Sequence, residues 1–343
     1  MHPALQAAVE QLIQGQDLSA NEMRDCIGAI MDGGCESMAV AALLTAIACK
    51  GPAAIEVVGA VQAMRERATR IAVRRRPLLD TCGTGGDRLH TFNISTATAI
   101  VAAACDVPVA KHGNRSVSSS SGSADVLEAL GVNIQLSPEQ AAECLDETGI
   151  TFCFAPLVHG AMKHAAPIRR ALGFPTIFNL LGPLTNPAGA EYQLLGASSV
   201  QRARLLSSAL SVLGCRKALV VCGNNELDEV CLWGPTTVFE VHSGRVQEQR
   251  WTPDDFDLPQ CDVLSLRVKS ADESAAFVRS ALAGEDGPAT AIVIANAAAA
   301  LLAAERAKSI SEAVATVRNT LHSGQATRRL EQLAAWTQSR RSI

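Results

Sequence analysis

The sequence predicts an α/β protein in which a small N-terminal all-helical domain precedes a large α/β domain with a central, mostly parallel sheet flanked by helices. Residues 1–70 show helical periodicity with little strand signal, whereas from Pro77 onward short apolar runs alternate with helical patterns. A composition with 48% hydrophobic but only 3% aromatic residues favours helices over β sandwiches. Because strand–helix alternation is typical of parallel sheets, we expect a helical domain at 1–70 and an α/β domain at 71–343.

Four amphipathic segments make up the N-terminal region, and glycine, serine or proline separates them. They span residues 2–15, 19–33, 37–51 and 53–68, and their apolar side chains recur at the spacing of one helix face. We therefore expect four helices that share one small core.

The second region begins with short apolar runs that we predict to be strands, at 77–83, 107–113, 149–156, 217–223 and 236–241. Helical patterns follow the first three of them, at 95–106, 123–131 and 164–173. A capping box that starts at Ser137 predicts a further helix start. The apolar stretch 291–304 is too short to span a bilayer, and we predict a strand end followed by a buried helix.

Composition and charge are those of an ordinary cytoplasmic protein. A net charge of −4 gives no global reason to expect nucleic acid or an anionic membrane as a partner. Residues 1–19 carry polar and charged side chains where a secretory signal has an apolar stretch, so we expect no signal peptide. Eleven cysteines without a C-x-x-C pair or cysteine–histidine clustering predict small core residues in a reducing compartment.

The segment DTCGTGGD at 80–87 follows the first predicted strand directly. Gly83, Gly85 and Gly86 leave amide N–H groups uncovered, and a turn of this kind ahead of a helix can cradle a phosphate group. It is not a Walker loop, and Arg88 stands where the dinucleotide-binding spacing requires glycine. A tight turn without a ligand is the alternative for this stretch taken alone.

Hydroxyl side chains come next, at the start of the following helix. Ser95 and Thr96, with Asn93 before them, lie where a serine or threonine most often caps a helix. A hydroxyl beside a phosphate-binding turn can instead face a phosphate oxygen or bind magnesium. Both roles are open, because the two hydroxyls are separate.

A basic, serine-rich segment follows the second predicted strand. Its potential donors are Lys111, His112, Asn114, Arg115, Ser116, Ser118 to Ser121 and Ser123, with Gly113 and Gly122 between them. A highly phosphorylated ligand needs such a spread of cationic and neutral donors. The alternative is a solvated basic loop ahead of a helix capped by Ser123.

Two further groups of side chains complete the set of candidates. Glu226, Asp228 and Glu229 follow the strand at 217–223, and carboxylates at a strand end suit Mg²⁺. An exposed acidic turn is the alternative. His159, His164 and Arg169 flank a segment rich in glycine, proline and aliphatic residues, where an arginine can grip an aromatic carboxylate.

Considered together, these motifs resemble those of the anthranilate phosphoribosyltransferase family, in the family's order and over nearly the whole chain. They are GTGGD at 83–87, FNIST at 92–96, KHGNRSVSS at 111–119, SGSADVLEALG at 121–131, FNLLGPLTNP at 178–187 and LDEV at 227–230. The resemblance implies that residues from about 165–190 join the helical domain, that a hinge links it to the α/β domain, and that two copies pair through the helical domains. It also implies Mg-dependent transfer of the phosphoribosyl group of phosphoribosyl pyrophosphate (PRPP) to the amino group of anthranilate. The products are N-(5-phosphoribosyl)anthranilate and pyrophosphate, a step of tryptophan biosynthesis with an oxocarbenium-like transition state.

The resemblance also implies a role for each matching residue. PRPP would be held by Gly83, Gly86, Asp87, Thr91, Asn93, Ile94, Ser95, Thr96, Lys111, His112, Gly113, Asn114, Arg115, Ser116, Val117, Ser118, Ser119 and Ser123. Anthranilate would contact Gly83, Asn114 and Arg169, with His112, His159 and Pro183 nearby. Two Mg²⁺ ions would bind at Ser95, Asp228 and Glu229, and the catalytic residues would be Lys111, Asp228 and Glu229.

The chain departs from the common family pattern at three positions. Ser120 lies where lysine is frequent, Arg88 where glycine is frequent, and Cys231 where serine is frequent. The first change removes one expected cationic contact to the pyrophosphate.

Two other functions fit parts of the sequence. A pyrimidine nucleoside phosphorylase-like enzyme would share the architecture but use free phosphate and a different phosphate loop. A non-catalytic nucleic-acid-binding relative would show a basic surface and eroded acidic ligands, whereas this chain is net negative and keeps Asp228 and Glu229.

Overall fold

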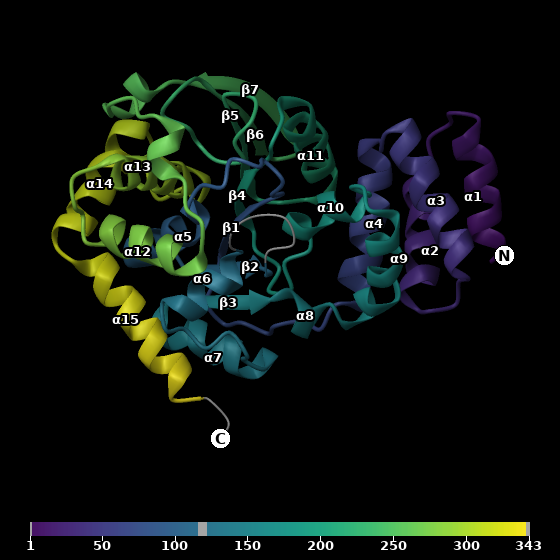
Figure 1. Ribbon diagram of the computed structural model, residues 1–343, viewed down its shortest axis with the longest axis horizontal. Coiled ribbons are helices and arrows are strands. Elements are labelled where there is room, and N and C mark those ends of the chain that lie inside the picture. The colour runs from purple at the N-terminus through teal and green to yellow at the C-terminus, as the bar shows by residue number, and fades with distance from the viewer. Residues whose placement is uncertain (1, 116–121, 341–343) are drawn as a thin grey trace.

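Four helices form a bundle at one end of the molecule in the computed structural model, which describes residues 2–115 and 122–340 (Figure 1). They are α1 (Pro3–Ile13), α2 (Ala20–Met31), α3 (Ser37–Lys50) and α4 (Ala54–Arg67), and they confirm the four helices predicted from periodicity. Buried Glu56 ties the bundle together, because its carboxylate accepts hydrogen bonds from the backbone N–H groups of Leu18 and Ala53 and from Lys50 Nζ.

A second stretch of chain packs against this bundle. It contains α9 (Ala166–Leu172), which contacts α3, and α10 (Phe178–Leu181), which contacts α4. The short helix α8 (Ala155–Val158) before them packs on β3 instead. Ala165, Ile177 and Phe178 belong to the same buried cluster as the apolar side chains of α1–α4. These contacts support placing residues 165–190 with the helical domain, although the domain boundary itself stays a prediction.

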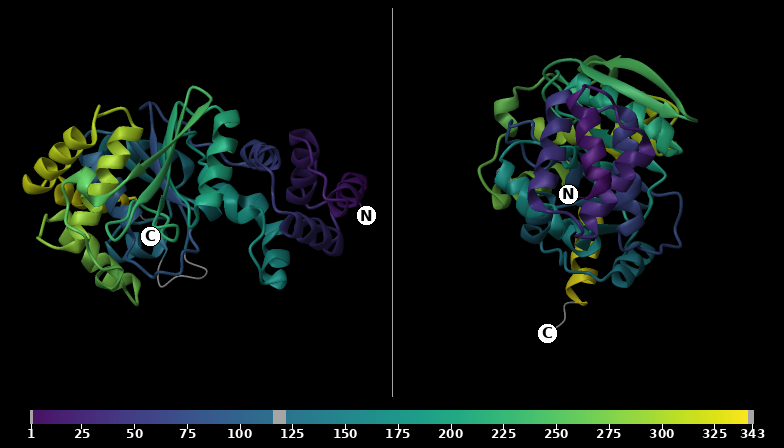
Figure 2. Two further views of the ribbon diagram at one scale, coloured as in Figure 1. Left: turned by 90° about the horizontal axis from the view of Figure 1, so that it is seen from above. Right: turned by 90° about the vertical axis from the view of Figure 1, so that its right-hand side faces the viewer.

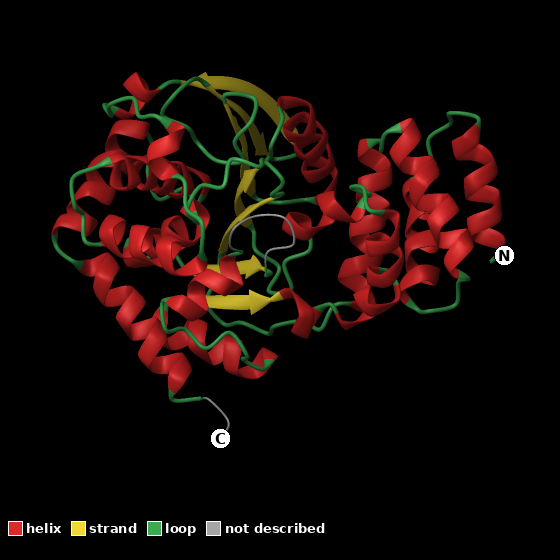
Figure 3. Ribbon diagram, in the orientation of Figure 1, coloured by secondary structure: helices red, strands yellow, loops and turns green. Residues whose placement is uncertain are grey.

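The other lobe is built on a seven-stranded sheet (Figure 3). Its strands are β1 (Leu79–Gly83), β2 (Val109–Gly113), β3 (Ile150–Phe154), β4 (Tyr192–Gly196), β5 (Lys217–Gly223), β6 (Thr236–His242) and β7 (Arg245–Trp251). The strand order is β3-β2-β1-β4-β5-β6-β7, with parallel pairing from β3 to β5 and antiparallel pairing for the last two strands. The order reverses between β1 and β4, which is where open α/β sheets bind ligands.

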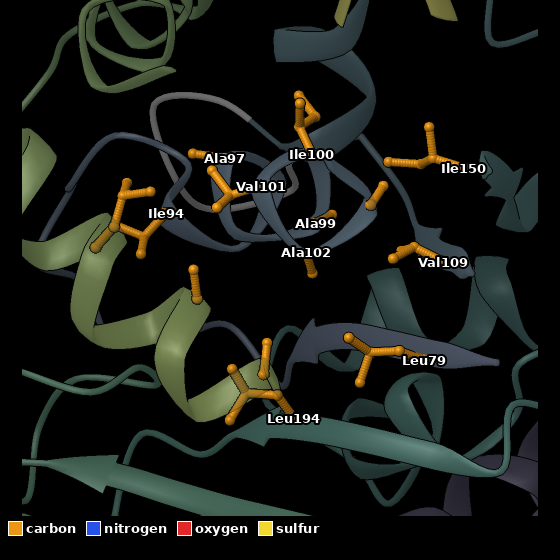
Figure 4. Close-up of a cluster of buried hydrophobic side chains, with 14 of the residues drawn as sticks. Leu79, Ile94, Ala97, Ala99, Ile100, Val101, Ala102, Val109, Ile150 and Leu194 are labelled. Carbon is orange, nitrogen blue, oxygen red and sulfur yellow. The ribbon is translucent and has the colours of Figure 1, made fainter. Parts of the chain in front are cut away.

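Helices cover both faces of this sheet. One face carries α5 (Ile94–Ala104), α13 (Pro288–Ala303) and the helices around them, and the other carries α11 (Val200–Leu213) (Figures 1 and 2). Leu219 and Val221 of β5 join the core with α5 and α13, whereas Val220 joins the core with α11. Figure 4 shows Ala102 of α5 on the side of the helix that faces Leu79 of β1 and Leu194 of β4. The remaining helices are α6 (Ser123–Ala129), α7 (Pro138–Thr148), α12 (Ala271–Leu282), α14 (Ile310–His322) and α15 (Gln325–Gln338).

Three details of the sheet and its helices differ from the expectations. The stretch 291–304 was predicted to begin with a strand end, and this is wrong, because it lies in the single buried helix α13. Alanine is the best helix former and dominates this segment, so the few β-branched residues of the segment also adopt the helical conformation. Strands β4 and β7 were not predicted.

The capping box at Ser137 is confirmed. None of the helices in the described parts of the chain is long and apolar enough to cross a membrane.

Candidate active site

Four of the parallel strands end in glycine at one edge of the sheet. These glycines are Gly83, Gly113, Gly196 and Gly223, at the ends of β1, β2, β4 and β5. A Cβ added at Gly196 would overlap the backbone carbonyl oxygen of Asp228, and one added at Gly83 would overlap the Asp228 carboxylate. The acidic segment therefore lies directly across the strand ends, and only glycine permits this approach. Sequence analysis missed Gly196 and Gly223, although each is the glycine that closes an apolar run.

The Asp228 carboxylate faces the glycine turn. Its Oδ2 accepts a hydrogen bond of 2.7 Å from the backbone N–H of Gly85. Burial, and then the neighbouring Asp87 carboxylate, raise the pKa of Asp228 to about 7. The pKa of Glu229 is also raised, first by burial and then by Asp228. The site therefore concentrates more negative charge than its surroundings balance.

Glu226, the third member of the predicted acidic group, has a different environment. Its Oε1 accepts hydrogen bonds from Trp233 Nε1 at 2.9 Å and from Asn224 Nδ2 at 2.8 Å. These two donors, the indole first, lower the pKa of Glu226. Glu226 therefore holds the loop that carries the other two carboxylates.

Lys111 supplies a cation at the same place. Its buried side chain extends from β2, and Nζ donates to Ser95 Oγ at 3.0 Å and to the backbone carbonyl oxygen of Thr81. Its positive charge opposes the rise in the pKa of Glu229. Residues from β1, β2, α5 and the acidic segment thus meet at one point, as the sequence predicted for the carboxyl edge of the sheet.

The side chains that meet at this edge of the sheet can bind a divalent cation. Asp87, Asp228 and Glu229 interact electrostatically with one another, and Lys111 is the cation that acts on Glu229. Within residues 2–115 and 122–340, no three histidine, cysteine or acidic side chains gather as a complete ligand set. Two carboxylates and a hydroxyl suit Mg²⁺, which takes few protein ligands and fills its coordination sphere with water and substrate phosphate oxygens.

The start of α5 is capped by Asn93. Its Oδ1 accepts a hydrogen bond of 3.0 Å from the backbone N–H of Thr96, so the prediction that Ser95 or Thr96 caps the helix is wrong. An asparagine outside the helix reaches the free N–H groups better than a hydroxyl already inside the first turn. Ser95 is thereby left to contact Lys111, whereas the side chains of Ile94 and Thr96 are buried. A role for Ile94 or Thr96 in binding PRPP would have to use the backbone.

The turn at 83–90 is held in unusual backbone conformations. Gly85 and Gly86 have φ values of 65° and 79°, and Arg88 has φ of 61°. Glycine adopts this left-handed region at little cost, which explains why glycine is frequent at position 88, whereas Arg88 adopts the same backbone at some steric cost. Thr91 forms an isolated antiparallel bridge with Arg267, which anchors the end of the turn.

The basic segment after β2 is only partly described. Arg115 forms ion pairs with Asp125 and Glu128 of α6, at 2.9 and 2.5 Å. The prediction that Ser123 caps this helix is wrong, because the N-cap is Gly122 and Ser123 Oγ donates to the backbone carbonyl oxygen of Asn114. The predicted ligands Ser116, Val117, Ser118 and Ser119, and the departure at Ser120, lie outside the described residues.

Two buried histidines lie together between the sheet and the bundle. The rings of His112 and His159 have centroids 5.1 Å apart, and His112 Nδ1 lies 3.0 Å from the backbone carbonyl oxygen of Gly182. His112 Nε2 and both ring nitrogens of His159 are buried without a hydrogen-bond partner of ordinary geometry among the described residues. Burial lowers the pKa of His112 to about 3 and that of His159 to about 4, so both rings are neutral at neutral pH.

These histidines should make the protein sensitive to acid. Because their pKa values are lowered on folding, the unfolded chain binds their protons more readily, and stability falls as pH drops below about 6.5. Each histidine should cost up to about 1.4 kcal/mol per pH unit until its folded pKa is reached. We expect His159→Phe to reduce the loss of unfolding free energy between about pH 7 and pH 5, measured by urea denaturation. An equal loss in His159→Phe and wild type would contradict this, and the exposed His322→Gln serves as the control.

Arg169 lies on α9 in the helical lobe. Its guanidinium carbon is 5.4 Å from the centre of the Phe178 ring, and one terminal nitrogen donates to Asn179 Oδ1 at 3.4 Å. Burial lowers the pKa of Arg169. His164, in contrast, lies against Gly33 of the bundle, so the structure does not bring it to the sheet edge.

Sequence analysis missed a buried network under His112. Asn186 Nδ2 donates to Asp80 Oδ2 at 2.8 Å and to the backbone carbonyl oxygen of Ala110 at 2.7 Å, and Asp80 Oδ1 accepts from the backbone N–H of His112 at 3.0 Å. The network ties the segment at 182–188 to β1 and β2. The only sequence signal was a charged residue, Asp80, inside an apolar strand. In the folded protein, burial raises the pKa of Asp80 to about 6.

Comparison with known proteins finds relatives along nearly the whole chain. The helical bundle domain of a glycosyl transferase family matches residues 6–68, and the α/β domain of the same family matches residues 75–327. An anthranilate phosphoribosyltransferase from Chromobacterium violaceum is 48% identical, over 96% of this chain and 97% of its own length. Such relatives do not support the phosphorylase-like or the nucleic-acid-binding alternative.

Solved structures give the same result. The anthranilate phosphoribosyltransferase of Thermus thermophilus superimposes with a TM-score of 0.91 at 42% identity, over 96% of this chain and 99% of that one. The Saccharomyces cerevisiae enzyme, in complex with PRPP and Mg, also gives a TM-score of 0.91, at 26% identity and over 99% of both chains. The order of the motifs, the two-lobed fold and these similarities lead to one conclusion. The chain belongs to the anthranilate phosphoribosyltransferase family.

Proposed function

We propose that this chain transfers the phosphoribosyl group of PRPP to the amino group of anthranilate at the carboxyl edge of β1, β2 and β4. The observation that carries the proposal is the meeting of Asp228 and Glu229 with the glycine turn and Lys111. Carboxylates, uncovered amides and an ammonium group within one site suit a ligand that brings both phosphates and a divalent cation.

The proposed PRPP site uses the turn, the start of α5 and the end of β2. Its described members are Gly83, Gly86, Asp87, Thr91, Asn93, Ile94, Ser95, Thr96, Lys111, His112, Gly113, Asn114, Arg115 and Ser123. Gly85 and Gly86 are exposed and have the left-handed backbone that presents amide N–H groups to an anion. Arg115 would exchange its contacts with Asp125 and Glu128 for phosphate oxygens.

Ser95, Asp228 and Glu229 are the proposed magnesium ligands, and we propose two ions by resemblance to the family. When bound, Mg²⁺ would neutralise part of the negative charge on the pyrophosphate leaving group. The surplus of carboxylates described above supports this assignment.

In the proposed reaction the bond from C1 of the ribosyl group to pyrophosphate breaks as the bond to the anthranilate nitrogen forms. An aromatic amine is unprotonated near neutral pH, so departure of the leaving group is the difficult part. Lys111 and the turn amides would stabilise the charge that grows on pyrophosphate, an effect of about 10²–10³-fold for one well-placed donor. No strong base is required, and the lowered pKa values of the two histidines make them weak bases.

The proposed acceptor site lies between the lobes. Gly83 and Asn114 are on the sheet side, whereas Arg169 is carried by α9 beside the bundle. Closure of the lobes would bring the amine into line with C1 and exclude water, which otherwise hydrolyses the activated sugar.

We further propose a cytoplasmic homodimer that pairs through the helical domains. Ile13 of α1 and Met38 of α3 are 75% and 81% exposed, and a second copy would cover such apolar side chains.

One assay tests the proposed function. Purified protein mixed with PRPP, Mg²⁺ and anthranilate should consume anthranilate, followed as loss of its fluorescence, and should release pyrophosphate. Loss of fluorescence should require all three additions. Phosphorolysis of a pyrimidine nucleoside without consumption of anthranilate would overturn the proposal.

Arg169→Ala should weaken the acceptor side selectively. Loss of a charge-assisted contact to a carboxylate should raise the anthranilate KM by about 10-fold or more, with a smaller change in the PRPP KM. Steady-state kinetics with each substrate varied in turn will measure both constants. The exposed neighbour Arg170→Ala is the matched control, and equal changes in both constants would mean that Arg169 does not bind anthranilate.

A further inference from the structure

A buried asparagine holds the acidic segment from below. Asn296 is completely buried in α13, and its side chain pairs with both backbone groups of Val230. Asn296 Oδ1 accepts a hydrogen bond of 2.8 Å from the Val230 N–H, and Nδ2 donates to the Val230 carbonyl oxygen at 2.9 Å. Val230 follows Glu229 directly, so this double contact fixes the backbone next to the proposed metal ligands.

The other side of the segment is fixed as well. Leu227 and Gly223 exchange backbone hydrogen bonds of 2.8 and 2.9 Å, as two residues of an antiparallel pair do. Asp228 and Glu229 are the two residues between these anchors. Their positions therefore depend on Leu227 at one end and on Val230 at the other.

Asn296 is a polar residue in a helix that is otherwise almost entirely apolar, which indicates that its side chain has a specific role. Nearly every other residue of α13 is apolar, and its side chains are buried along almost the whole helix. Nδ2 also donates to the carbonyl oxygen of Ile292, one turn earlier, so the amide is fully paired and its orientation is fixed. A buried amide in such a helix is costly unless its hydrogen bonds are made, and here they are all made to fixed backbone groups.

We propose that Asn296 is a positioning residue for the proposed Mg²⁺ site, acting through the backbone of Val230 on Asp228 and Glu229. The inference rests on the proposed function. Residues that orient metal ligands from outside the coordination sphere typically change metal affinity by about 10- to 100-fold when they are removed. We expect Asn296 to act on metal affinity more than on the fold.

The test is calorimetric titration of Mg²⁺ into the full-length protein with saturating PRPP. Asn296→Ala should bind Mg²⁺ about 10- to 100-fold more weakly than wild type. Thr290→Ala is the matched control, because it removes a part-buried hydrogen bond to the backbone carbonyl oxygen of Glu285 from the same helix without touching the acidic segment. It should leave Mg²⁺ affinity within about threefold of wild type.

A second variant keeps the test decisive if Asn296→Ala does not fold. In Asn296→Ser the hydroxyl can donate to the Ile292 carbonyl oxygen within the helix, but it leaves Val230 without its partners. The same loss of Mg²⁺ affinity is expected, with an unchanged far-UV circular dichroism spectrum.

The outcomes separate this inference from the proposed function. If Asp228→Asn with Glu229→Gln binds Mg²⁺ as wild type does, the metal assignment fails and the inference fails with it. If that double variant loses Mg²⁺ but both Asn296 variants keep wild-type affinity, only the inference is overturned. Equal weakening in Thr290→Ala would also overturn it, because the effect would then come from general loosening of α13.

Discussion

The double variant Asp228→Asn with Glu229→Gln should turn over about 10³-fold more slowly than wild type at saturating PRPP and anthranilate. Both carboxylates are proposed magnesium ligands, and amides bind Mg²⁺ poorly because they carry no charge. The Gly85 N–H can still donate to an amide oxygen at position 228, so the backbone across the strand ends should be retained. Single-turnover measurement of anthranilate consumption over a range of Mg²⁺ concentrations will measure the effect.

The same variant should be more stable than wild type without metal, and the gain should depend on pH. The pKa of Asp228 is raised on folding, to about 7, so the folded protein holds this proton more tightly than the unfolded chain. Wild type therefore loses stability as pH rises from about 4 through about 7, whereas the double variant does not. The difference in melting temperature should be larger at about pH 8 than at about pH 5.

Two results would contradict these expectations. An unchanged dependence of turnover on Mg²⁺ would remove Asp228 and Glu229 from the metal site. A double variant that is less stable than wild type at high pH would mean that the carboxylates do not repel one another in the folded protein. Glu226→Gln is the control for the overall charge of the segment, because Glu226 bonds to Trp233 and Asn224 instead.

Among variants that add a single methyl group, Gly196→Ala should cause the largest loss of folding stability. The added Cβ would overlap the backbone carbonyl oxygen of Asp228, so either β4 or the acidic segment must move. Backbone cannot rotate away as a side chain can, and a destabilisation of at least about 3 kcal/mol is expected. Because the segment carries both proposed ligands, the protein that still folds should bind Mg²⁺ poorly.

Comparison with two other glycines makes this prediction specific. Gly83→Ala meets the Asp228 carboxylate, a side chain that can turn aside, so it should lower Mg²⁺ affinity with a smaller loss of stability. Gly34→Ala meets nothing closer than the Ala29 carbonyl oxygen, at 3.8 Å, and should be nearly neutral. Urea denaturation and Mg²⁺ titration of the three variants will rank them. Wild-type stability in Gly196→Ala would show that the acidic segment does not cross β4 as described.

Local patterns predicted much of the fold and the site. The bundle helices α1–α4 repeat apolar residues at helical spacing, and the turn at 83–87 and the carboxylates at 228–229 each follow an apolar run closely. Because parallel strands place their carboxyl ends at one edge, these separate motifs could be expected to meet without any knowledge of distances.

The features that were missed depend on distant partners. Strand β4 has five residues, the same length as β1, β2 and β3, so its length does not explain why it was missed; its role comes from its place between β1 and β5. Strand β7 is an exposed edge strand with no apolar alternation that could mark it. Asn296 lies 66 residues from Val230, and nothing in its own segment indicates which backbone it holds. Such roles follow from tertiary contacts, which periodicity and spacing do not encode.

The apolar cluster shared by α1–α4, α11 and one face of the sheet restricts how the two lobes can move. It joins Val61 of α4, Leu206 of α11 and Val220 of β5 in one continuous interior, and α4 and α11 lie in direct contact. Pulling the lobes apart would expose this interior to water, so they cannot separate as independent bodies. The α4–α11 contact would instead act as the fulcrum of the proposed closure, so the movement over anthranilate that we propose would take place on the side away from it.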